Sequence, residues 1–230
     1  VKTHHLLPQA VAFGGEIEVV PWLGSRATHI ASGESGRALL PGDLLTIAGT
    51  ATASPPVGDL MVPDFVTAAG PIRAVRGPQD DYFTAATIAA LFGSEFRVSA
   101  DYDRMGMRLD GPHLPVAAAL TMPSEAILRG SVQIAGHGSP TILMADHGTA
   151  GGYPKIATVI SADFGRVAQL RVGGGLRFAE VTAAEAVRLA RARVDQMAAA
   201  VAAAGVPASS LTERLLSSNL VSGVVEGSET

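Results

Sequence analysis

The chain has 230 residues, of which 47% are apolar and 17% charged, with a formal net charge of −4 and no cysteine. This composition argues against a disordered chain, and the missing cysteine excludes disulfides, iron–sulfur ligation and a thiolate nucleophile. Slight acidity without a basic cluster also argues against binding to nucleic acid or to an anionic membrane surface. No apolar run reaches membrane-spanning length, and we expect a cytoplasmic protein.

Short apolar runs, separated by many of the 26 glycines and 14 prolines, fill the first three quarters of the chain. Closely spaced runs of this kind are typical of a β-barrel or β-sandwich. The runs include Ile17–Val20, Leu44–Ile47, Ala74–Val75 and Ile142–Ala145. Within residues 104–110 the apolar positions alternate, which predicts a half-buried strand with Arg104 and Arg108 on one face.

A first helix is predicted over residues 80–92. Asp80 or Asp81 is expected to cap it, and Gly93 follows it. Its apolar stripe consists of Phe83, Ile88, Leu91 and Phe92.

A longer helix is predicted from Thr182 onward, because Thr182 and Glu185 have the spacing of a capping box. Its apolar positions are Val187, Ala190, Val194, Met197 and Val201, and we expect its alanine-rich middle, Met197 to Ala204, to pack on the barrel. Gly205 and Pro207 are predicted to end the helix. The residues from 215 to 225 are apolar enough for a last strand or a docked segment, and residues 50–58 are a linker candidate.

The densest group of chemically useful residues lies between Ile142 and Lys155, where an apolar run leads into a loop. The loop contains Asp146, His147, Thr149, Gly151, Gly152, Tyr153 and Lys155. The glycines permit close approach of backbone N–H groups to an anionic ligand, and Lys155 is one of only two lysines. The competing interpretation is a tight turn at the two glycines with an exposed lysine.

Other candidates are weaker. Arg104 and Arg108 are equally suited to clamp a phosphate or carboxylate and to pair with neighbouring aspartates. Ser124-Glu125 is interpreted mainly as the start of a helix or turn. A metal site of Asp146, His147 and His137 has little support, since no metal-ligand spacing is present, and we predict none. No phosphate-binding loop, serine-hydrolase elbow or dinucleotide fingerprint is present.

Several blocks of the sequence together resemble the biotin-dependent carboxyltransferase family, which includes the C subunit of 5-oxoprolinase and allophanate hydrolase subunit 2. The resemblance runs from about Gly14 to Val225. The blocks are Gly14–Ile17, Pro21–Thr28, Arg76–Gln79, Asp103–Pro112 and Met144–Thr158.

The resemblance implies a cyclophilin-like β-barrel and one component of an ATP-dependent complex that opens 5-oxo-L-proline to L-glutamate. The implied partners are a B subunit that is itself cyclophilin-like and a further A subunit. On this hypothesis Asp146, His147 and Lys155 are catalytic. Arg104, Arg108, Thr149, Gly151, Gly152 and Tyr153 then bind substrate or phosphate.

The implied cofactor is ATP, with Mg²⁺ or on the partner subunit, and biotin only if the carboxyltransferase label applies. The alternatives are an allophanate hydrolase or urea carboxylase subunit, and a non-catalytic module that binds a kinase-inhibitor-like B subunit. A prolyl isomerase is disfavoured, because a shared fold does not carry function.

Three departures from the family pattern bear on these expectations. The chain lacks an N-terminal β segment that family members usually carry, so residues 1–50 are expected to be the remnant of an N-terminal β subdomain and residues 51–230 a cyclophilin-like domain. Gly136–Pro140 and Gly148–Tyr153 also lack a carboxylate, an amide and a hydroxyl of the family pattern. These losses affect the expected substrate and activity.

Overall fold

A computed structural model describes residues 15–29, 32–34, 36–49, 63, 65, 69–117 and 122–203. Among them, no helix is long and apolar enough to cross a membrane. The predicted linker at 50–58, the helix end at 205–207 and the apolar segment at 215–225 lie outside these residues.

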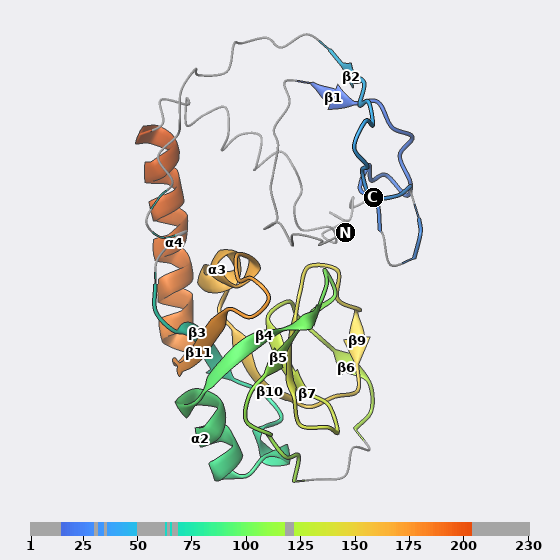
Figure 1. Cartoon of the computed structure of the whole chain (residues 1–230). Helices are drawn as coiled ribbons and strands as arrows, with labels where there is room; N and C mark the ends of the chain where they lie inside the picture. The colour runs from blue at the N-terminus through green and yellow to red at the C-terminus, as the bar shows by residue number, and fades with distance from the viewer. Residues whose placement is uncertain are drawn as a thin grey trace, which may run out of the picture.

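Seven strands form a closed barrel, which confirms the prediction of a mainly β fold (Figure 1). Around the barrel the order is β10-β3-β11-β4-β5-β8-β7, and β7 pairs with β10 again. All pairs are antiparallel except β3 with β11. The strands are β3 (Ile72–Arg76), β4 (Glu95–Tyr102), β5 (Gly106–Asp110), β7 (Ser131–Ile134), β8 (Pro140–Leu143), β10 (Lys155–Val159) and β11 (Gly175–Glu180).

The barrel interior is filled by alternate residues of these strands. Phe96 and Phe178 meet there edge to face, with ring centroids 5.9 Å apart. In β5, Met107 and Leu109 are fully buried whereas Arg108 faces outward, as the alternation predicted. The apolar stripe of each strand therefore faces the core, and its polar residues form the outer wall.

Two small sheets accompany the barrel. β1 (Glu16–Ile17) pairs with β2 (Ile47–Ala48), and β6 (Glu125–Ala126) pairs with β9 (Ala150–Gly151). The second pair, called here the β6–β9 ribbon, is formed by segments that flank the β7–β8 hairpin in sequence.

The first predicted helix is present in two pieces, η1 (Asp80–Tyr82) and α2 (Ala85–Gly93). The prediction that Asp80 or Asp81 caps the helix is wrong. Thr84 is the cap, and its hydroxyl accepts a hydrogen bond from the Thr87 N–H. Phe83 and Leu91 are buried in the core, so the apolar spacing was informative where the capping residue was not.

The long helix α4 (Ala183–Ala203) begins as predicted, with the Thr182 hydroxyl accepting from the Glu185 N–H at 3.2 Å. The prediction that its alanine-rich middle packs on the barrel is wrong for the described residues, because Met197, Ala198 and Ala199 are exposed. The helix does contact the barrel strand β3 and the turn η2 (Ser161–Asp163), which leads into α3 (Phe164–Ala168).

Candidate functional site

Four polar side chains form a row across the outer wall of the barrel. In the strand register, Arg108 of β5 is opposite Thr141 of β8, Thr141 is opposite Gln133 of β7, and Gln133 is opposite Lys155 of β10. Residues directly opposite in neighbouring strands point to the same face. The row passes from exposed Arg108 to Lys155, whose side chain is only 6% exposed.

Lys155 is buried because the β6–β9 ribbon brings a carboxylate to it. Its Nζ lies 3.2 Å from Oε2 of Glu125, a ribbon residue whose side chain remains 45% exposed. Gln79 connects the two residues. Its amide Nε2 donates to Glu125 at 2.7 Å, and its Oε1 accepts from the Lys155 backbone N–H at 3.1 Å. We call Gln79, Glu125, Gln133 and Lys155 the lysine cluster.

Two glycines make this close packing possible. A Cβ on Gly77 would lie 1.8 Å from the Lys155 carbonyl oxygen, which is an impossible contact with backbone. A Cβ on Gly151 would lie 2.9 Å from Nε2 of Gln133, the group that donates to the Tyr153 carbonyl at 3.3 Å. The first glycine lets β3 end against Lys155, and the second leaves room for the Gln133 amide.

The lysine cluster offers a hydrogen-bond donor and an acceptor side by side. A lysine ammonium carries three donors, and an ionised carboxylate only accepts. Because the ammonium is removed from water, its interaction with an oxygen atom of a bound molecule is stronger than at an exposed surface. Glu125 remains accessible to water, so the pair meets solvent on the Glu125 side.

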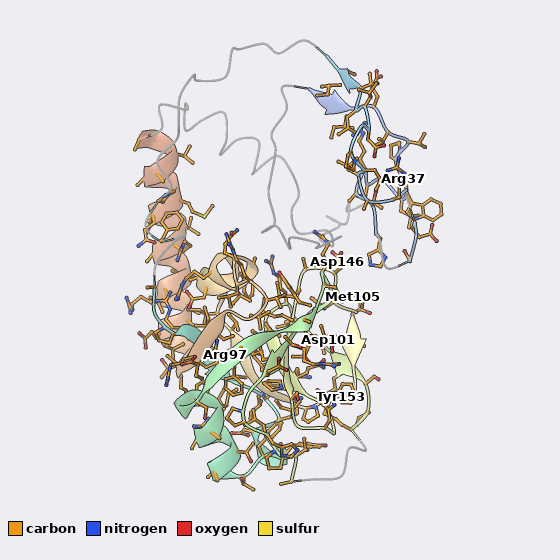
Figure 2. The ribbon with its side chains drawn as sticks, viewed as in Figure 1. Arg37, Arg97, Asp101, Met105, Asp146 and Tyr153 are labelled. Atoms are coloured by element: carbon orange, nitrogen blue, oxygen red, sulfur yellow. The ribbon has the colours of Figure 1, made fainter. Side chains whose placement is uncertain are left out.

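Asp146 belongs to a different part of the barrel. Its carboxylate forms two hydrogen bonds with Arg104, at 2.5 and 2.8 Å, and these bonds lower the pKa of Asp146 below its usual value. Asp146 is therefore ionised at neutral pH and has no proton to give. Figure 2 shows Asp146 well separated from Tyr153, which precedes Lys155 by two residues.

The strand register explains this separation. Asp146 follows the Leu143 end of β8, where its N–H donates to the Arg104 carbonyl, whereas Lys155 is opposite Gln133 near the closed end of the β7–β8 hairpin. His147 lies beside Asp146, and its Nδ1 donates to the Gly148 carbonyl at 2.6 Å. The structure thus does not bring the predicted catalytic residues Asp146 and His147 to Lys155.

Arg108 lines a groove of about 470 Å³ together with residues 100–103, Gly106 and Thr141. Its Nη1 pairs with Asp101 at 2.7 Å, but both side chains are substantially exposed. An exposed pair of this kind contributes little free energy, and an incoming carboxylate is able to replace Asp101.

The remaining predicted residues lie in the β6–β9 ribbon or next to it. Gly151 is opposite Glu125 in the ribbon, and Gly152 and Tyr153 connect the ribbon to Lys155. The Thr149 carbonyl accepts from the Ile127 N–H, which extends the ribbon by one bond. Among the described residues there is no group of three or more histidine, aspartate or glutamate side chains able to hold a metal ion.

Sequence reasoning missed Glu125 and both glutamines of the lysine cluster. Ser124-Glu125 was interpreted as the start of a helix or turn, whereas Glu125 is the ion-pair partner of Lys155. The sequence did hold a signal for this partner. Lys155 is a rare lysine at the start of a predicted strand, and a lysine that is buried there needs a carboxylate from elsewhere in the chain.

The closed barrel and its covered lysine cluster define a mainly β domain with a polar site on its outer wall. The chain belongs to the carboxyltransferase domain family, subdomains A and B, whose model matches residues 7–180. The resemblance noted from the sequence blocks is confirmed.

Three curated proteins show where this domain is found. The C subunit of 5-oxoprolinase from Haemophilus influenzae is 38% identical over 69% of this chain and 50% of its own length. The protein of the same name from Escherichia coli is 33% identical over 85% and 62%. A putative urea carboxylase of Emericella nidulans is 28% identical over 92% of this chain and 19% of its own length. The chain thus spans about half to two thirds of the length of the two 5-oxoprolinase relatives.

The fold has a solved counterpart. The crystal structure of the K. lactis urea amidolyase matches 79% of this chain and 12% of that protein, with a TM-score of 0.66 and 24% identity. This likeness shows the barrel fold and its accompanying helices.

Proposed function

We propose that the chain acts as the C subunit of an ATP-dependent 5-oxoprolinase-like complex, which opens 5-oxo-L-proline to L-glutamate together with A and B subunits. The names of its two bacterial relatives support this assignment. The observation that carries it is the Lys155–Glu125 pair, with its donor and acceptor 3.2 Å apart.

A lactam matches this pair because its amide is held in the cis form. Its carbonyl oxygen and N–H group therefore point to the same side of the ring, as one acceptor and one donor. Lys155 then donates to the carbonyl oxygen and Glu125 accepts from the N–H. An open-chain trans amide presents the two groups on opposite sides and fits the pair less well.

The ring opens when water adds to the carbonyl carbon and the C–N bond breaks. Lys155 stabilises the negative charge that develops on the carbonyl oxygen. Glu125 accepts a proton from the attacking water and passes it to the departing nitrogen, which becomes the amine of glutamate. Arg108 lies three strands from Lys155 in the row, which is about 14 Å of sheet, so it takes no part in this step.

Arg104 and Arg108, the two arginines predicted to bind phosphate, do not fit a triphosphate. Arg104 and Arg108 each have a carboxylate partner, and Asp101 adds negative charge to the groove. No step through ATP is therefore derived for this chain, and we place ATP on a partner subunit.

We also propose that residues 1–50 are the remnant of an N-terminal β subdomain and that residues 51–230 form the cyclophilin-like domain. The β1–β2 pair forms a sheet of its own, whereas the barrel strands begin at Ile72. We also propose a cytoplasmic location, which the absence of cysteine supports.

A urea carboxylase or allophanate hydrolase role is the second candidate, favoured by the match of the Emericella relative over 92% of the chain. A cyclic ureido group such as that of biotin also has its carbonyl and N–H groups on one side, so Lys155 and Glu125 fit it too. Biotin bound there would supply carboxyl transfer.

The test is glutamate release from 5-oxoproline and ATP by the chain mixed with the A and B subunits from the same source. We expect no release when this chain alone is left out. Lys155→Met and Glu125→Gln should each lower kcat by about 100-fold, as loss of an oxyanion donor or a general base does. Arg97→Gln is the control: it removes an exposed cation from β4 and should leave kcat unchanged.

Two results would contradict the proposal. Full activity of Lys155→Met would exclude the lysine cluster as the site. If the complete mixture is inactive with 5-oxoproline, carboxylation of urea and hydrolysis of allophanate should be tested. Inactivity with all three, while the B subunit still copurifies, would indicate a binding module.

A further inference from the structure

A second cavity, of about 300 Å³, lies between helix α4 and the barrel and shares no residue with the lysine cluster. Part of its lining is apolar and part is strongly basic. Leu189 and Ala192 of α4 and the ring of Phe65 contribute apolar surface. Arg73, Arg166 and Arg193 contribute three guanidinium groups.

The first two arginines have a counter-ion. Asp163 is fully buried, and its carboxylate accepts from the Arg73 backbone N–H, Nε and Nη2 at 2.8, 3.0 and 2.6 Å. Arg166 Nη1 lies 3.3 Å from the same carboxylate. Glu185 also interacts electrostatically with Arg73. Three guanidinium groups thus face two carboxylates, and the wall of the cavity has a net positive charge.

Arg193 is the uncompensated member. Its Nη1 donates to the Phe65 carbonyl at 3.1 Å, and its guanidinium lies 4.3 Å from the centre of the Phe65 ring. In the part of the chain that the structure describes, no carboxylate pairs with Arg193, and its buried Nε has no hydrogen-bond partner. A buried donor on a cation is costly to leave unpaired.

We propose that this cavity binds a small organic anion, a carboxylate or a phosphate monoester with a compact apolar body. The anionic group lies against the guanidinium of Arg193, and the body packs on Leu189, Ala192 and Phe65. A planar guanidinium suits either anion, since both present paired oxygens to its N–H groups. The proposal is independent of the lactam chemistry at Lys155.

The test uses the full chain and three probes of similar size: benzoate, phenyl phosphate and benzamide. Isothermal titration should show saturable binding of one anion per chain, which weakens as salt is added. Benzamide has the same body without charge and should not bind. Whichever of the two anions binds more tightly identifies the preferred group.

Arg193→Gln should weaken anion binding by at least about tenfold, the usual effect of losing one charge-assisted hydrogen bond. Arg191→Gln is the matched control, because Arg191 is exposed on the same helix and does not line the cavity. If Arg193→Gln loses helix content by circular dichroism, Arg193→Lys decides the question. It retains the charge without Nε and should also bind more weakly than wild type.

Three results would overturn the proposal. They are no saturable binding of either anion at millimolar concentration, equal binding of benzamide, and the same loss of affinity in the Arg191→Gln control.

Discussion

The buried carboxylate of Asp163 gives the sharpest test of how the barrel is held together. Replacing it with asparagine removes the charge that Arg73 and Arg166 share, while the side chain keeps nearly the same shape. Breaking a buried ion pair from one side typically costs about 3–5 kcal/mol. For a chain of this size, that loss lowers Tm by roughly 6–20 °C.

The pH dependence follows from the pKa of Asp163. Burial alone would raise this pKa, but hydrogen bonds from the Arg73 side chain and backbone, with the charges of Arg73 and Arg166, together lower it. A lowered pKa in the folded state means that the stabilisation is complete above the unfolded value of about 4 and is lost as the pH falls through the folded value.

Thermal unfolding followed by circular dichroism measures this directly. The Tm difference between wild type and Asp163→Asn should stay constant from about pH 5 to 7 and narrow below about pH 4. Asp101→Asn is the control, because its pair with Arg108 is exposed and contributes less than about 1 kcal/mol. Equal Tm values for the two variants at neutral pH would refute the reasoning.

Two further predictions concern local packing. Gly77→Ala should destabilise the protein by more than about 2 kcal/mol, because its Cβ would overlap the Lys155 carbonyl. Gly165→Ala has open space in helix α3 and should stabilise the protein by about 0.4–1 kcal/mol. Urea unfolding midpoints test both, and similar midpoints for the two variants would contradict the geometry. Thr84→Ala should lower the free energy of unfolding by about 1 kcal/mol, because it removes the acceptor for the Thr87 N–H. Thr84→Asn should retain most of the stabilisation that the cap provides. A loss in the asparagine variant as large as in the alanine variant would exclude the capping role.

The fold could be predicted from the sequence where one periodicity applied to a whole element. The alternation around Met107 specified the inner and outer faces of β5, and the spacing of Ile88, Leu91 and Phe92 located α2. The packing of α4 was predicted wrongly because a helix rich in alanine has no single strongly apolar face. Leu189 and Arg193 line the cavity between α4 and the barrel, whereas Val194 is exposed.

The candidate site could be predicted only in part, because its residues come together through long-range pairing. Lys155 was singled out by its rarity, but its partners Gln79 and Glu125 lie 76 and 30 residues away in the sequence. Asp146 was included because it is close to Lys155 along the chain. In space, the β7–β8 hairpin separates them, which no local pattern could reveal.

The shortness of the β6–β9 ribbon has a dynamic consequence. Its ladder pairs only Glu125 with Gly151 and Ala126 with Ala150, so opening it requires far less free energy than unfolding the barrel. Amide hydrogen exchange should therefore be fast at Ile127 and slow at core positions such as Ile142. A ligand that contacts both Lys155 and Glu125 binds the closed ribbon alone. The apparent affinity of the ligand then depends on the population of the closed form. Binding should slow amide exchange throughout the β6–β9 ribbon, although the ligand contacts only Glu125 in it.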